Sequence, residues 1–63
     1  MNGEIIINEL KNNKSGFTVS ELAVRLHLSR HTVANTFAFL EGAGKISIRK
    51  AGMAKIYFWR EKT

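Results

Sequence analysis

Four polar side chains stand close together in the middle of the chain. They are Arg30, His31, Thr32 and Asn35. Arginine can donate two hydrogen bonds to a guanine edge, asparagine can pair in the same bidentate way with adenine, and histidine or threonine can bond a base edge or a phosphate. If one helix carries them, they have the chemistry to read duplex DNA. Ser29 would then begin that helix, where a phosphate is favoured by unpaired amides and the helix dipole.

A second group of cations follows near a predicted turn, at Arg49, Lys50 and Lys55. On the tip of a hairpin they would straddle the backbone of an adjacent minor groove. The alternative is that they only keep an exposed sheet edge soluble, a common use of lysine. The chain has ten Lys and Arg against five Asp and Glu, a net charge of +5, which favours a polyanionic partner.

Other chemistries have little support in the sequence. There is no cysteine, and the five acidic residues are scattered glutamates with no nucleophile beside a base, so we expect no enzyme and no cofactor. His27 and His31 are four apart, but a predicted turn separates them, so no metal site is expected. The apolar runs are far shorter than the ~20 residues of a membrane span, and no signal peptide is evident. We expect a cytoplasmic, nucleoid-associated protein with no membrane partner.

The hydrophobic pattern predicts the elements that position these residues. Apolar stripes at helical spacing predict helices over about 2–13, 19–26 and 30–41, and alternation predicts a wing over about 45–59. Residues 17 and 18 are candidates for a short third strand. So short a chain is expected to form one domain, 1–63. The predicted fold is α+β, mainly α: a winged helix-turn-helix with three helices and a two- or three-stranded antiparallel wing sheet.

Capping residues mark the helix ends. Thr18 and Glu21 have the spacing of a capping box, in which each side chain satisfies the other residue's amide. Ser29 is suited to cap the third helix. Gly42 and Gly44 are expected to end it, because either can adopt the left-handed conformation that follows many helices.

The third helix has two contrasting sides. Val33, Phe37 and Leu40 fall in one narrow sector, which we predict to be buried. The opposite side is formed by His31, Asn35, Ala38 and Phe39. The preceding helix and turn make this side a candidate for reading bases rather than only an exposed polar face.

Phe39 is unusual on a side that would face DNA. One interpretation is that it packs beneath the wing against Tyr57 and Trp59, as an extension of the core. The other is that these three aromatics form a partner-binding anchor, because exposed aromatics often dominate interfaces.

Three segments carry a resemblance to a known family: the opening MNGEIIINEL, the stretch TVSELAVRLHLSRHTVANTFAFLEGAGKI, and Gly52-Met53-Ala54 running into Tyr57, Phe58 and Trp59. Over nearly its whole length the chain resembles winged helix-turn-helix domains. More narrowly it resembles the small fimbrial operon regulators of the PapI/FaeA type. The wing is shorter than in that family, with fewer arginines at its tip, and the C-terminal tail is very short.

The resemblance implies a co-regulator of pilus phase variation. Such proteins act with the leucine-responsive regulatory protein at promoter DNA whose adenine methylation is switched. The matching positions are residues 30–35, with Arg49 and Lys50 at the wing.

The sequence is therefore compatible with three functions. The first is a sequence-dependent regulator of transcription on double-stranded DNA, helped by a second copy or a DNA-bound partner, with the oligomeric state open. The second is a protein-protein adaptor anchored by Phe39, Tyr57 and Trp59. The third is recognition of an unusual nucleic-acid conformation through Asn35, Phe39 and Trp59, against which the absence of wing prolines argues.

Overall fold

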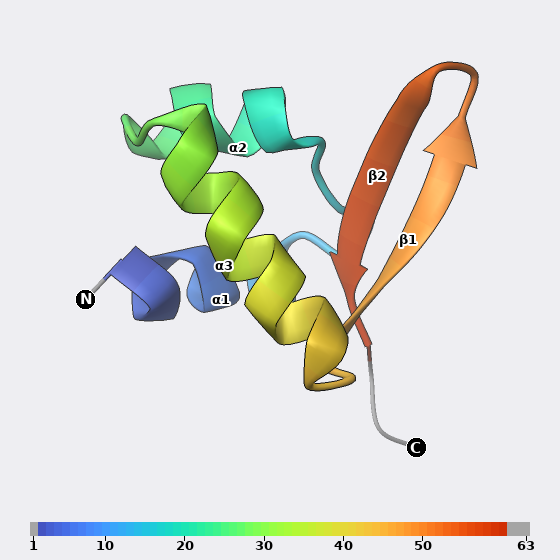
Figure 1. Cartoon of the computed structure of the whole chain (residues 1–63), viewed down its shortest axis with the longest axis horizontal. Helices are drawn as coiled ribbons and strands as arrows, with labels where there is room; N and C mark the ends of the chain where they lie inside the picture. The colour runs from blue at the N-terminus through green and yellow to red at the C-terminus, as the bar shows by residue number, and fades with distance from the viewer. Residues whose placement is uncertain (1, 61–63) are drawn as a thin grey trace.

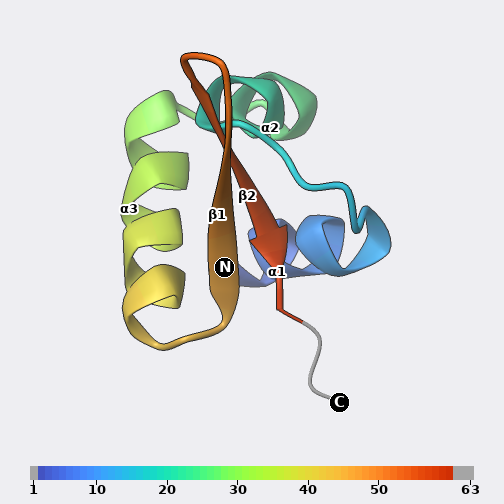
Figure 2. The same cartoon turned by 90° about the vertical axis from the view of Figure 1, so that its right-hand side faces the viewer.

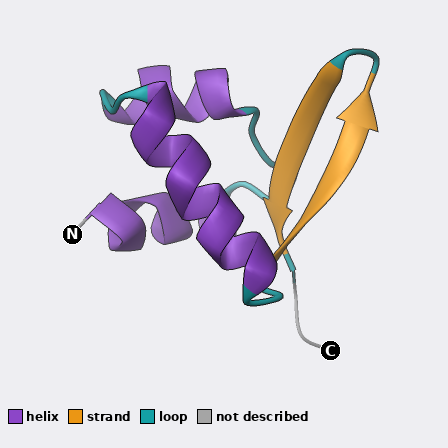
Figure 3. Ribbon diagram, in the orientation of Figure 1, coloured by secondary structure: helices purple, strands orange, loops and turns teal. Residues whose placement is uncertain are grey.

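The computed structural model describes residues 2–60, while Met1 and residues 61–63 of the expected domain lie outside the described part. Along the chain it contains helix α1 (Asn2–Asn12), helix α2 (Val19–Leu26), helix α3 (Arg30–Gly42), strand β1 (Ile46–Ala51) and strand β2 (Ala54–Trp59). The helices pack together and the hairpin stands beside them (Figure 1). The predicted fold, a mainly helical winged helix-turn-helix, is confirmed (Figure 3).

α1 ends one residue earlier than the expected bound at residue 13. The side chain of Asn13 explains this end, because its Nδ2 donates to the carbonyl oxygen of Glu9 at 3.1 Å. The last carbonyls of a helix lack intrahelical partners, and a side-chain donor satisfies one of them. Asn13 is therefore a cap rather than a helical residue.

α2 begins with the predicted capping box. The Glu21 amide donates to Thr18 Oγ1 at 3.0 Å, and the Thr18 amide donates to Glu21 Oε1 at 2.9 Å. At the other end His27 adopts a left-handed conformation, with φ of 58°. This residue reverses the chain, so that only residues 27–29 separate α2 from α3.

α3 runs one residue further than expected, to Gly42. Gly44, rather than Gly42, adopts the left-handed conformation, with φ of 74°. The Lys45 amide then donates to the carbonyl oxygen of Leu40 at 2.9 Å, which closes the helix end. The turn directs the chain straight into β1.

β1 and β2 form a two-stranded antiparallel sheet in which Ile46 pairs with Trp59 and Ala51 pairs with Ala54. The third strand considered for residues 17 and 18 is reduced to one bridge, between Phe17 and Tyr57, with N···O distances of 2.9 and 2.8 Å. The middle of β2 is therefore hydrogen-bonded to the loop that precedes α2.

Gly16 allows that close approach. Its φ is 88°, and a Cβ at this position would lie 2.5 Å from the carbonyl oxygen of Tyr57 and 2.9 Å from Phe58 Cβ. Both the conformation and the space require glycine.

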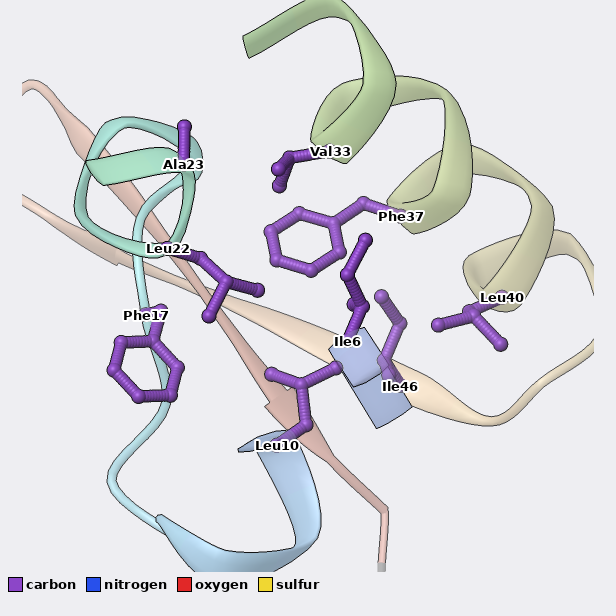
Figure 4. Close-up of a cluster of buried hydrophobic side chains, with 9 residues drawn as sticks. All are labelled: Ile6, Leu10, Phe17, Leu22, Ala23, Val33, Phe37, Leu40 and Ile46. Carbon is purple, nitrogen blue, oxygen red and sulfur yellow. The ribbon is translucent and has the colours of Figure 1, made fainter. Parts of the chain in front are cut away.

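The core lies between the three helices and one face of the hairpin (Figures 2 and 4). Its buried side chains are Ile6, Leu10, Phe17, Leu22, Ala23, Val33, Phe37, Leu40 and Ile46. Phe37 is 1% exposed, and its ring stacks on Tyr57 with centroids 4.4 Å apart. Each large side chain buried here contributes about 1.5–3 kcal/mol. Among the described residues no polar or charged side chain is buried, so the core is held by packing alone.

Candidate nucleic-acid interface

The side of α3 that faces away from the core is open to solvent. Val33, Phe37 and Leu40 are buried as predicted, and they fix the rotation of the helix about its axis. His31 and Asn35 consequently lie on the opposite side and are exposed. In Figure 2, α3 forms one side of the molecule, and no other element covers its outer surface.

His31 and Asn35 contact each other on this surface. Asn35 Nδ2 lies 3.1 Å from His31 Nε2. An amide nitrogen donates, so in this arrangement the ring nitrogen is the acceptor. The bond restricts the Asn35 amide while leaving its oxygen and second N–H free. A bidentate contact with adenine needs one donor and one acceptor of this kind.

The residues at the start of α3 are more engaged than the sequence suggested. Ser29 Oγ accepts from the Thr32 amide at 3.1 Å and donates to Thr32 Oγ1 at 2.9 Å, which confirms Ser29 as the N-cap. Arg30 Nη1 donates to Ser20 Oγ at 3.2 Å, across to α2. Arg30 therefore leans toward the start of α2, at the rim of the exposed side rather than at its centre. Its position suits a backbone phosphate better than a base edge.

The cations of the wing lie on both faces of the hairpin. Lys50 and Lys55 are register partners directly opposite each other, whereas Arg49 pairs with Ile56. Because successive residues of a strand alternate between faces, Arg49 projects from the other face. All three side chains are exposed, and within residues 2–60 no carboxylate forms an ion pair with them. Directly opposed like charges destabilise a strand pair, and an anion bound there would relieve the repulsion.

Phe39 does not lie beneath the wing, so the expectation that it packs against the wing aromatics is wrong. Its side chain is 74% exposed. It follows Arg30 by nine positions, about two and a half helical turns, and so faces the opposite flank of α3. Since Arg30 reaches toward α2, Phe39 faces away from it.

Tyr57 and Trp59, the other two aromatics considered for a partner-binding anchor, are partly buried and pack against the core. The Tyr57 ring stacks on Phe37, and Lys11 Nζ lies 5.1 Å from the centroid of the Trp59 ring. Their place in the fold follows from the pairing with Ile46 and Ile48, which puts all four side chains on the core face of the hairpin. The expected aromatic trio does not come together.

Nowhere in the described part of the chain do three His, Cys, Asp or Glu side chains gather as a metal site would require. The helices that the structure describes are all too short or too polar to span a bilayer.

Two residues of this surface were not among the site residues predicted from the sequence, although Met53 was placed in the turn of the wing. Met53 is fully exposed at the tip of the wing, and Ser20 is the residue to which Arg30 is bonded. The location of Met53 in the turn could be predicted from the sequence, since a glycine and a methionine stand between two alanines there. The Ser20 contact depends on the crossing of α2 and α3, which no local pattern reveals.

Comparison with known proteins bears on the chain as a whole. A family model described as HTH domain matches residues 4–57. The search of curated proteins and the search of solved structures found no match. Helix-turn-helix domains bind DNA, and these families are generally not enzymes. The chain is therefore a DNA-binding regulator, and because the matched residues run from α1 through β2, it belongs to the HTH domain family.

Proposed function

We propose that this protein regulates transcription by binding duplex DNA in a sequence-dependent manner, with α3 in the major groove and the wing along the backbone of the adjacent minor groove. The observation that carries the proposal is the exposed His31–Asn35 pair on the open side of α3. Asn35 reads an adenine edge, and His31 holds the Asn35 amide in position. Arg30 and Thr32 contact phosphates at the mouth of the groove.

The wing supplies contacts that do not depend on sequence. Arg49, Lys50 and Lys55 have no carboxylate partner within the described residues, so their charge is available to phosphates. Each phosphate contact releases counterions, so affinity falls as salt rises. This division assigns base reading to α3 and positioning to the wing.

A module of this size needs help to occupy its site. Single small modules bury only about 600–1,000 Å² of protein surface on DNA, which gives modest affinity. A second copy, or a partner already bound nearby, would raise occupancy by effective concentration. We therefore favour a co-regulator, acting in the cytoplasm on the nucleoid.

The finer role that we propose is control of a fimbrial operon together with the leucine-responsive regulatory protein. Its support is the resemblance of three segments to fimbrial regulators, of which the Gly52-Met53-Ala54 turn is the narrowest. Gel-shift titration of a fimbrial promoter tests this role. The protein should raise the affinity of the leucine-responsive protein at least several-fold, and an unchanged affinity would remove the fimbrial assignment while leaving DNA binding intact.

An adaptor function is the second candidate, and the exposure of Phe39 favours it. This ring is 74% exposed on the flank of α3 that faces away from α2. An exposed aromatic is a common interface anchor. Tyr57 and Trp59 pack on the core, so Phe39 would be the anchor on this flank and the other two aromatics would not contribute.

Fluorescence anisotropy with a labelled random duplex pool, followed by selection, separates the two functions. DNA binding predicts saturable association whose logarithmic salt slope corresponds to several phosphates, and a selected sequence enriched over the pool. Binding of Phe39→Ala should equal that of the unchanged protein. No association at low salt would favour the adaptor, whereas loss of DNA association in Phe39→Ala would place Phe39 in the DNA interface.

A further inference from the structure

Met53 is an apolar side chain placed where nothing in the described chain covers it. It occupies the turn of the wing and is fully exposed, more so than the other exposed large apolar residues, Ile5, Val24 and Phe39. A solvent-facing turn gains nothing in stability from methionine, because the side chain buries no surface there. The residue is therefore available for a contact outside the chain.

The tip that carries Met53 is narrow. Ala51 pairs with Ala54, and the two residues between them, Gly52 and Met53, make the turn. Gly52 has φ of 63° and Met53 does not have positive φ, the pattern of a tight two-residue hairpin turn with glycine first. The residues on either side of Met53 and the pair that closes the turn are therefore alanine or glycine. Such a slim tip matches a minor groove only about 6 Å wide.

The length of the free hairpin also matches that groove. Ile56, the register partner of Arg49, is the last residue before the tip whose side chain lies against the body, because its Cγ2 would be 2.9 Å from a Cβ at Gly16. Two further residues lead from Arg49 to Ala51, a rise of about 7 Å, and the turn extends beyond them. The minor groove is about 7.5 Å deep. Figure 1 shows the turn standing clear of the helices, so the tip can enter without a clash from α2 or α3.

The cations behind the tip lie on both faces of the hairpin, so they could contact the two phosphate backbones that border a minor groove. Lys50 and Lys55 project from one face of the hairpin and Arg49 from the other. A hairpin inserted edge-on between two phosphate backbones would place positive charge against both strands. The same insertion would bring Met53 to the floor of the groove.

We propose that Met53 is an apolar wedge that enters the minor groove, partly unstacks one base step and bends the DNA. The inference rests on the proposed DNA-binding function and adds to it a specificity-determining residue. Methionine is among the side chains that proteins insert between base steps, with kinks of roughly 20–90° toward the major groove. Pyrimidine–purine steps unstack most readily, so the wing should prefer such a step without reading a base edge.

The test uses a short duplex selected from a random pool, labelled at its two ends for energy transfer. A second set carries 2-aminopurine, whose fluorescence rises on unstacking, at successive positions. The variants are Met53→Gln, which keeps the length of the side chain but makes it polar, and Met53→Leu, which keeps it apolar. The turn is exposed, so neither change affects a packed position.

The wild-type protein should increase end-to-end transfer and raise 2-aminopurine fluorescence at one step. Met53→Gln should return both signals to those of free DNA while losing less than tenfold in affinity, because the cations remain. Met53→Leu should keep both signals. Equal bending by wild type and Met53→Gln, or saturable wild-type binding with no bend, would overturn the wedge alone. Absence of wild-type binding would overturn the proposed function and the wedge with it.

Discussion

The proposed roles of Asn35 and His31 can be tested separately. Asn35 would contact a base, and His31 would hold the Asn35 amide in position. Asn35→Ala should cost about 1–3 kcal/mol of discrimination at one A·T pair, because the bidentate contact is lost. His31→Ala should shift discrimination at the same pair by less, since it only frees the Asn35 amide. Anisotropy titrations of the selected duplex and of single-base variants measure both effects.

The matched control is Asn8→Ala, which removes the same side chain from an exposed position on α1. It should leave discrimination unchanged. If Asn35→Ala weakened all duplexes equally, Asn35 would be a backbone contact, and its assignment as a base reader would be wrong.

His27 exemplifies local strain that the fold tolerates. Its left-handed conformation costs an L-residue about 1–2 kcal/mol, a penalty that glycine avoids. His27→Gly should therefore raise the free energy of unfolding by about 1 kcal/mol after allowance for the greater freedom of glycine in the unfolded chain. Urea denaturation monitored by circular dichroism measures this free energy of unfolding.

His27→Ala is the companion variant, because it removes the imidazole but keeps the Cβ penalty. It should show no gain. A gain in alanine as large as that in glycine would mean that the imidazole, rather than the backbone, is the source of the strain.

At the scale of single residues, sequence patterns predicted the helix caps correctly but did not predict where the Phe39 side chain packs. The capping box at Thr18 and Glu21 and the cap at Ser29 depend on residues three apart, so the sequence contains the whole interaction. The destination of Phe39 depends on which flank of α3 meets the other elements. That is a tertiary property, and the prediction that it packed under the wing was wrong.

At the scale of elements, the wing carries a pair of like charges, Lys50 and Lys55, that lowers the stability of the hairpin. Lys55→Glu should turn a repulsive cross-strand pair with Lys50 into an attractive one and raise the free energy of unfolding by up to about 1 kcal/mol. The same change should weaken DNA binding and lower the magnitude of the logarithmic salt slope by about one unit or more. Thermal melting and anisotropy at several salt concentrations give the two quantities.

Lys55→Gln provides the intermediate case, since it removes the repulsion without adding an acid. Its stability and affinity should both fall between those of the wild type and Lys55→Glu. If Lys55→Glu left affinity untouched, the wing lysines would serve solubility alone.

The order and type of the elements were predictable, because each has its own period and stop signals. The bounds of α1 and α3 moved by one residue, for α1 because the Asn13 side chain caps its end and for α3 because the left-handed residue is Gly44. The third strand could not be predicted in its actual extent. It depends on Gly16 lying against Tyr57 and Phe58, a contact between segments far apart in sequence.

For the whole molecule, stability depends on a small core with little redundancy. Domains have about 0.05–0.15 kcal/mol of stability per residue, or roughly 3–9 kcal/mol for this length. Phe37→Ala should remove about 3–5 kcal/mol, because Phe37 is 1% exposed and carries the stack on Tyr57. Most of the helical circular dichroism should be lost near 37 °C.

Phe39→Ala is the control two positions away on the same helix. With 74% of its side chain exposed, it should change the free energy of unfolding by less than about 0.5 kcal/mol. Equal losses in the two variants would mean that Phe39 packs in solution, and that the rotation assigned to α3 is incorrect.

The molecule as a whole has two surfaces that different partners could use. One comprises the exposed His31 and Asn35 on the open side of α3 and the exposed Lys50 and Lys55 near the tip of the wing. The other is the flank around Phe39. The proposed DNA recognition would use the first surface, whereas an adaptor would use the second.

Amide chemical shifts recorded by NMR while a selected duplex is titrated into the labelled protein test the central claim most directly. The account predicts shifts at Arg30, His31 and Asn35 together with residues 49–55, all weakening steeply as salt is raised. Shifts confined to the flank around Phe39 and to α1, with the open side of α3 and the wing silent, would contradict it.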